Sequence, residues 1–168
     1  MVSPAPRVML PSAPNAKPPP SSRAFALPDA DATARLAASV ARAARLGDAI
    51  LLSGPLGAGK TTFARAFLRS ASGEPALEVP SPTFTLVQSY DTPIGTVHHY
   101  DLWRLDGPAA LTELGWEDAR DGIVIVEWPD RLGGEAPRDA LSITLSMDQG
   151  DVRHATLLGW PDRLETFA

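Results

Sequence analysis

The chain has no cysteine among its 168 residues. This absence excludes disulfide bonds, thiolate metal sites and cysteine nucleophiles, and it is consistent with a reducing, cytoplasmic location. The longest aliphatic runs, residues 50–52 and 123–126, are far shorter than the roughly 20 apolar residues of a membrane-spanning helix, so we expect no membrane association. The 15 basic residues are outnumbered by 20 acidic ones. Non-specific binding to nucleic acid or to an anionic membrane is therefore not the expected main activity.

What is present is the composition of an ordinary folded domain, with 44% apolar and 21% charged residues. Residues 1–23 are the exception, because they hold 7 of the 17 prolines and neither an aromatic nor an acidic residue. Proline cannot continue a helix or donate to a sheet. We therefore expect a disordered, proline-rich tail over residues 1–23 and a single, acidic folded domain over residues 24–168.

Helical and strand patterns alternate after this tail. Asp29 is suited to cap a helix that Gly47 ends, and Phe63 and Phe67 lie four residues apart, on one face of a second helix. The pattern predicts helices at residues 29–47, 60–71 and after 108, and strands at residues 49–52, 84–90, 96–100, 123–126, 141–147 and 152–158. Residues 123–126 are all apolar, as in a central strand. The sum is an α/β fold with a mixed sheet flanked by helices.

The strongest motif is a glycine-rich loop at residues 54–61, with the sequence GPLGAGKT. It fits the phosphate-binding pattern G-x-x-x-x-G-K-[ST] and lies between an expected buried strand and an expected helix. Backbone N–H groups and the helix N-terminus would converge on phosphate oxygens, and the glycines allow the close approach. Lys60 would reach the β- and γ-phosphates, and the Thr61 hydroxyl would ligate Mg²⁺. The loop indicates a P-loop NTPase-like fold.

A magnesium nucleotide site also needs a carboxylate at the end of a neighbouring strand. Glu127 directly follows the apolar run 123–126, and Asp101 ends the predicted strand 96–100. Two carboxylates at the same sheet edge as the loop would provide the charge that phosphoryl transfer requires. From the residues alone, each carboxylate is equally well explained as a solvated strand terminus.

Four motifs carry a resemblance to a known family. They are residues 56–63 (LGAGKTTF), 81–87 (SPTFTLV), 99–105 (HYDLWRL) and 126–129 (VEWP). The first is common to P-loop proteins, whereas the other three, in this order and spacing, are specific. Together they resemble the TsaE (YjeE) family of bacterial tRNA threonylcarbamoyladenosine biosynthesis, over most of residues 27–131.

This resemblance implies a small P-loop ATPase that uses Mg²⁺ to hydrolyse ATP to ADP and phosphate. The ATPase would act with the TsaB and TsaD proteins, which install a threonylcarbamoyl group on adenosine 37 of tRNA, and it would meet tRNA only indirectly. The resemblance implies that Thr61 and Glu127 hold the metal and that Lys60, Asp101 and Glu127 are catalytic. It favours Asp101 as the carboxylate that orients water or supports the metal shell.

Further residues enter only through the resemblance. Ser81 and Thr83 would belong to a switch-like loop near the γ-phosphate, and Trp128 would lie near the base. The nucleotide-binding residues so implied are Thr33, Leu56, Gly57, Ala58, Gly59, Lys60, Thr61, Thr62 and Trp128. The chain departs from the family pattern at Pro55, where aspartate is frequent, and at Trp103, where tyrosine is usual.

Two other functions share these features. A small-molecule or nucleoside kinase would have the same loop and metal, with residues 131–138 as the only candidate lid. A non-catalytic module switched by ATP would bind without turnover. His98 and His99 are adjacent on a strand and point to opposite faces, so they are interpreted as ordinary hydrogen-bonded histidines, with His99 close to the edge of the site.

Overall fold

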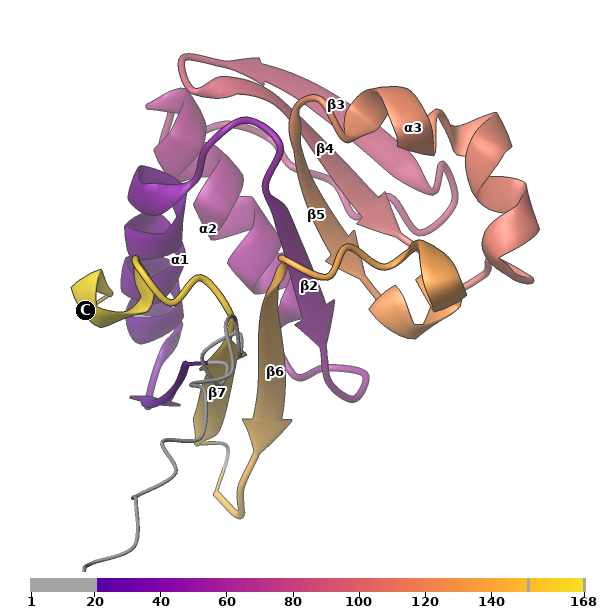
Figure 1. Ribbon diagram of the computed structural model, residues 1–168. Coiled ribbons are helices and arrows are strands. Elements are labelled where there is room, and N and C mark those ends of the chain that lie inside the picture. The colour runs from indigo at the N-terminus through magenta and orange to yellow at the C-terminus, as the bar shows by residue number, and fades with distance from the viewer. Residues whose placement is uncertain (1–20, 151, 168) are drawn as a thin grey trace, which may run out of the picture.

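A seven-stranded sheet organises the part of the chain that the computed structural model describes, residues 21–150 and 152–167 (Figure 1). Its strand order is β1-β7-β6-β2-β5-β4-β3. The strands are β1 (Ser22–Leu27), β2 (Ala49–Ser53), β3 (Val87–Thr92), β4 (Gly95–Asp101), β5 (Ile123–Glu127), β6 (Leu141–Met147) and β7 (Arg153–Leu158). The α-helices are α1 (Ala30–Ala43), α2 (Lys60–Ser72) and α3 (Trp116–Ala119), and the 3₁₀ helices are η1 (Pro108–Leu114), η2 (Pro129–Glu135) and η3 (Leu164–Thr166).

The centre of the sheet is parallel and its margins are antiparallel. Strands β6, β2, β5 and β4 run parallel to one another, whereas β3 pairs with β4, β7 with β6, and β1 with β7 in antiparallel fashion. All residues of β5 are buried, as are the first four of β2. Such strands need cover on both faces, which explains their continuous apolar sequences. The α/β fold with a mixed sheet is therefore confirmed.

Helices cover both faces of the sheet (Figure 1). On one face, α1 and α2 pack side by side and bury Leu36, Phe63 and Phe67 against apolar strand residues. The other face is covered by η1, α3 and η2, where the rings of Tyr100 and Trp116 pack edge to face, with 5.3 Å between their centroids. Within residues 21–150 and 152–167, no helix has the length and apolar character needed to span a bilayer.

The sheet begins earlier than the sequence pattern predicts. Residues 1–20 of the predicted tail lie outside the described residues, but Ser22 and Arg23 belong to β1, which pairs with β7. The Arg23 guanidinium also donates to the backbone oxygen of Phe167 at 2.7 Å. No strand was expected here, because the short segment has no clear alternation of apolar and polar residues.

Three predicted elements differ in their limits. The strand expected at residues 84–90 is β3 at Val87–Thr92, because Leu86 has a φ of 67° and its N–H donates to Pro82 O, which makes residues 82–86 a turn. Asp29 does cap α1, accepting from the Ala32 N–H at 2.7 Å, but the helix ends at Ala43 rather than near Gly47. After Pro108, a 3₁₀ helix and the single turn α3 replace the predicted helix.

The parallel strands bring the candidate site residues to one edge. β2 ends next to the glycine-rich loop, β4 ends at Asp101 and β5 ends at Glu127. Asp101 and Glu127 are directly paired across the sheet, and Glu127 pairs with Leu52 of β2. In open α/β sheets, ligands bind at this carboxyl edge.

A glycine at the start of the loop fixes how closely the loop approaches β6. Gly54 has a φ of 143°, and an added Cβ would collide with the backbone oxygen of Leu145. Gly73 also has a positive φ, of 70°, but a Cβ there would meet nothing within 4 Å.

We therefore expect Gly73→Ala to cost about 1–2 kcal/mol of unfolding free energy, and Gly54→Ala to cost clearly more. Urea unfolding followed by circular dichroism measures both, and equal losses would contradict the close packing described for Gly54.

Candidate functional site

The glycine-rich loop leads directly into the N-terminus of α2. Gly57 and Gly59 have φ values of 80° and 107°, which side-chain-bearing residues rarely adopt. The helix begins at Lys60, and in the described part of the chain Phe63 is the first of its residues whose N–H donates to a backbone carbonyl, that of Gly59 at 2.9 Å. The first-turn N–H groups are thus available to an anion, and the positive end of the helix dipole adds to their attraction.

Lys60 is buried beneath this loop. Its Nζ donates to the backbone oxygens of Gly54 and Pro55 at 2.7 and 2.9 Å, and it lies 4.1 Å from the centroid of the Trp128 ring. Burial lowers the pKa of the Lys60 ammonium, and the carboxylates of Glu127 and Asp101 oppose that shift. The ammonium group is therefore held at the loop with two acidic side chains close by.

Glu127 is bound by side chains from two other elements. Its Oε1 accepts from the Thr61 hydroxyl at 2.7 Å, and its Oε2 lies 2.8 Å from Nε2 of His99. Glu127 is only 2% exposed. The contact with Thr61 joins the first turn of α2 to the end of β5, so the two predicted metal ligands are in direct contact.

Asp101 belongs to a second set of hydrogen bonds at the same edge. Its Oδ2 accepts from the Thr83 hydroxyl at 3.1 Å, and its Oδ1 accepts from the Trp103 N–H at 3.1 Å. Thr83 is also 2.8 Å from the Ser81 hydroxyl. The predicted switch-like loop is thus hydrogen-bonded to the second carboxylate, and a movement of the loop would release Asp101.

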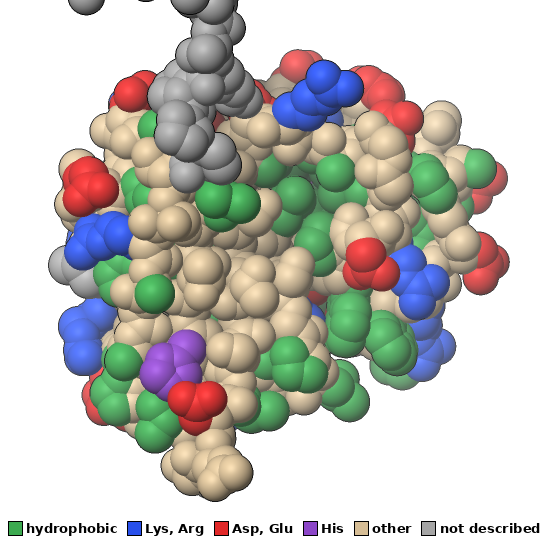
Figure 2. Space-filling view, turned by 60° about the horizontal axis from the view of Figure 1, so that its bottom comes forward, with side chains coloured by type: hydrophobic (Ala, Val, Ile, Leu, Met, Phe, Trp, Pro, Cys, Tyr) green, Lys and Arg blue, Asp and Glu red, His purple; other side chains and the backbone are tan. Residues whose placement is uncertain are grey.

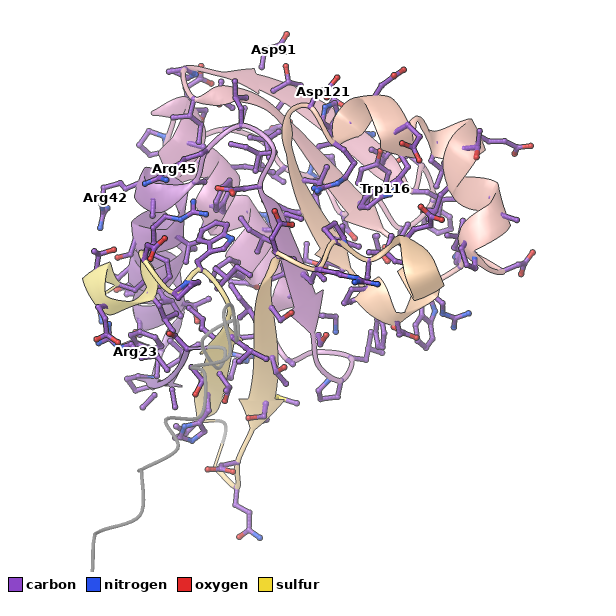
Figure 3. All side chains as sticks on the ribbon, viewed as in Figure 1. Arg23, Arg42, Arg45, Asp91, Trp116 and Asp121 are labelled. Atoms are coloured by element: carbon purple, nitrogen blue, oxygen red, sulfur yellow. The ribbon has the colours of Figure 1, made fainter. Side chains whose placement is uncertain are left out.

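These groups surround a cavity of about 270 Å³. Its lining residues come from the loop and α2, the segment before β3, the ends of β4 and β5, and β7: Leu56, Gly57, Gly59, Lys60, Thr61, Thr62, Ser81, Thr83, Asp101, Glu127, Trp128 and Arg153. The acidic residues Asp91 and Asp121 lie away from this cavity, at the opposite end of the sheet (Figure 3). Trp116 is also distant from the cavity and packs in the apolar cluster beside α3.

A family model described as "Threonylcarbamoyl adenosine biosynthesis protein TsaE" matches residues 27–155. The chain belongs to the TsaE family. Two relatives bear the name "tRNA threonylcarbamoyladenosine biosynthesis protein TsaE". The Rickettsia felis protein is 42% identical over 99 residues, which are 58% of this chain and 57% of that protein. The Bacillus subtilis protein is 31% identical over 133 residues, 79% of this chain and 83% of that protein.

A solved structure has a similar fold. The crystal structure of Bacillus subtilis YdiB superposes with a TM-score of 0.68 at 25% sequence identity, covering 87% of this chain and 90% of that one. The chain spans little more than half of the length of the Rickettsia felis relative.

Most of the site residues implied by the TsaE resemblance line the cavity, and two do not. Thr33 is buried in the first turns of α1, where its N–H donates to Asp29 O, and it does not line the cavity. Ala58 is in the loop, but its side chain packs in the apolar core between the sheet and α2. Ala58 can therefore contribute only its backbone, and its N–H already donates to Pro55 O.

Arg153 was not predicted as a site residue. It lies at the start of β7, its Nη2 donates to Gly57 O at 3.3 Å, and its buried Nε has no partner among the described residues. No motif marks it, because a single arginine in an alternating strand is typical of a solvated face. The hairpin of β6 and β7 brings it back to the loop.

Proposed function

We propose that this chain is a Mg²⁺-dependent ATPase that acts in the biosynthesis of threonylcarbamoyladenosine at position 37 of tRNA. The observation that carries the proposal is the convergence of Lys60, the Thr61 hydroxyl and the carboxylates of Asp101 and Glu127 on one cavity, beside the N-terminus of α2. Membership of the TsaE family supports the pathway, because its members take part in making this modified nucleoside.

The donor groups around the cavity fit a magnesium nucleotide. Free N–H groups at a helix N-terminus and a lysine suit phosphate oxygens. Thr61 and Glu127 would hold Mg²⁺ through oxygen atoms, and Mg²⁺ normally takes its remaining ligands from phosphate groups and water. The ion would neutralise charge that develops on the transferred phosphoryl group.

The residues around the cavity have separate roles in the proposed reaction. Lys60 binds phosphate oxygens, and Asp101, already a hydrogen-bond acceptor at the cavity wall, orients the attacking water or takes its proton. Thr83 competes for the same Asp101 oxygen, so the position of residues 81–83 regulates how freely Asp101 acts. Arg153, whose Nη2 donates to Gly57 O, adds a positive charge at the cavity wall.

Partner proteins would complete the site. Leu56, Phe84 and Trp103 are 82%, 80% and 48% exposed beside the cavity. We call these three residues the apolar rim; the Trp103 ring also stacks on Trp128, with centroids 4.4 Å apart. Figure 2 views the molecule from the side on which the central parallel strands end, and hydrophobic side chains gather at its surface there. A partner covering this rim would exclude water and speed turnover. We assign this role to TsaB and TsaD in the cytoplasm, with tRNA reached through them.

The kinase alternative receives no support from the candidate lid at residues 131–138. Leu132 is fully buried, and Arg131 donates to Leu105 O at 3.2 Å. None of these residues lines the cavity. Leu132 fixes the segment in the apolar cluster of the α3 face, away from the cavity that an acceptor would have to enter.

The proposed reaction requires Asp101 for the hydrolysis of ATP but not for the binding of ATP. With the TsaB–TsaD pair present, Asp101→Asn should lower phosphate release by about 100-fold or more while ATP still binds, because Asn keeps the shape but not the basicity. Asp91→Asn, at the far end of the sheet, is the matched control and should be unchanged. The assignment of ATP hydrolysis is tested by measuring phosphate release from ATP by the chain alone, with the TsaB–TsaD pair, and with candidate phosphoryl acceptors. Normal turnover by Asp101→Asn, or a phosphorylated acceptor, would contradict it.

The rim predicts a different kind of defect. Phe84→Ala should weaken binding of the partner pair by about 10-fold or more, and lower the stimulated rate at limiting partner, while leaving ATP affinity of the isolated chain unchanged. Leu46 is similarly exposed, at 64%, in the turn before β2, away from the cavity, so Leu46→Ala serves as control. Equal partner affinity for Phe84→Ala and Leu46→Ala, measured by calorimetry, would mean that the rim is not the interface.

A further inference from the structure

Glu127 is hydrogen-bonded to His99, a side chain that has no role in the proposed hydrolysis of ATP. His99 is fully buried, and its Nε2 lies 2.8 Å from Oε2 of Glu127. The sheet register explains the contact. His99 pairs with Ile125, two residues before Glu127, and side chains two apart on a strand share a face. His99, Asp101 and Glu127 therefore all project to the face that α2 covers.

The hydrogen-bond inventory of the imidazole indicates which atom donates. Nδ1 of His99 is buried and has no partner among the described residues. With the proton on Nε2, the ring donates to Glu127 and leaves only an acceptor lone pair without a partner. With the proton on Nδ1, a buried N–H would be unpaired and Nε2 would face a carboxylate without a proton between them, which costs more. His99 is thus the donor.

We propose that His99 is a positioning residue that aims Glu127 at the metal site. This inference depends on the proposed function. The carboxylate has two oxygens, of which Oε2 is bound by His99 and Oε1 faces the Thr61 hydroxyl. Without a donor at Oε2, the carboxylate can rotate to satisfy that oxygen elsewhere, and Oε1 leaves the position where Mg²⁺ would bind. Partners that orient a metal ligand in this way typically change metal affinity by 10–100-fold.

Loss of the His99 N–H donor should therefore weaken the binding of magnesium and leave the binding of the nucleotide itself unchanged. His99→Phe keeps a ring of similar size without a donor, whereas His99→Gln keeps an N–H at the end of its side chain. Calorimetry with a non-hydrolysable ATP analogue, in Mg²⁺ and in EDTA, measures the gain in affinity due to magnesium. We expect His99→Phe to reduce that gain by about 10-fold or more, with little change in EDTA, and His99→Gln to restore most of it.

His98→Phe is the matched control. The neighbouring His98 is 2.7 Å from the Ser89 hydroxyl, on the other face of β4, so its loss should leave the magnesium effect unchanged. Thermal unfolding without ligand shows whether each variant folds, and His99→Asn, whose amide is too short to reach Oε2, replaces His99→Phe if that variant does not. A folded, donor-free variant with the wild-type magnesium effect would overturn the inference, as would equal losses with and without magnesium. A wild-type chain that binds no analogue would instead contradict the proposed function.

Discussion

The parallel pairing of β2, β5 and β4 determines where the glycine-rich loop and the two carboxylates of the site lie. Because these strands run in one direction, the end of β2, Asp101 and Glu127 meet at a single edge. The glycine-rich loop turns the chain there and starts α2 beside them. If β4 ran antiparallel to β5, Asp101 would lie at the far end of the sheet, near Asp91 and Asp121. The chemistry thus depends on strand direction before it depends on any single side chain.

Charge balance at this edge depends on hydrogen bonds from several elements. Two buried carboxylates close together would repel each other, and buried charges are costly unless they are paired. Glu127 accepts a hydrogen bond from the Thr61 hydroxyl, and Asp101 accepts one from the Thr83 hydroxyl. The Lys60 ammonium lies near both carboxylates. The same contacts connect α2, β4, β5 and the segment before β3. A bound anion and a divalent cation would enter an arrangement that is already oriented for them.

Much of this could be predicted from the sequence, since the signals were local. The loop motif is contiguous, and the apolar run before Glu127 identifies a buried strand that ends at a carboxylate. Residues that depend on tertiary pairing could not be found in this way. Arg153 reaches the loop only because β7 folds back along β6. The prediction for Thr33 came from the family resemblance alone, and here that side chain is buried in α1 and lines no part of the cavity. The turn at residues 82–86 depends on a positive φ at Leu86, which no propensity indicates for leucine.

The proposed function requires that the carboxyl edge of the sheet bind ATP together with magnesium. Titration calorimetry of the folded chain with ATP, in the presence and absence of Mg²⁺, measures this binding. We expect saturable binding at one site per chain, tighter with Mg²⁺ than without it, since Thr61 and Glu127 contribute only through the metal. Binding that is absent, or that is indifferent to magnesium, would contradict the proposed function.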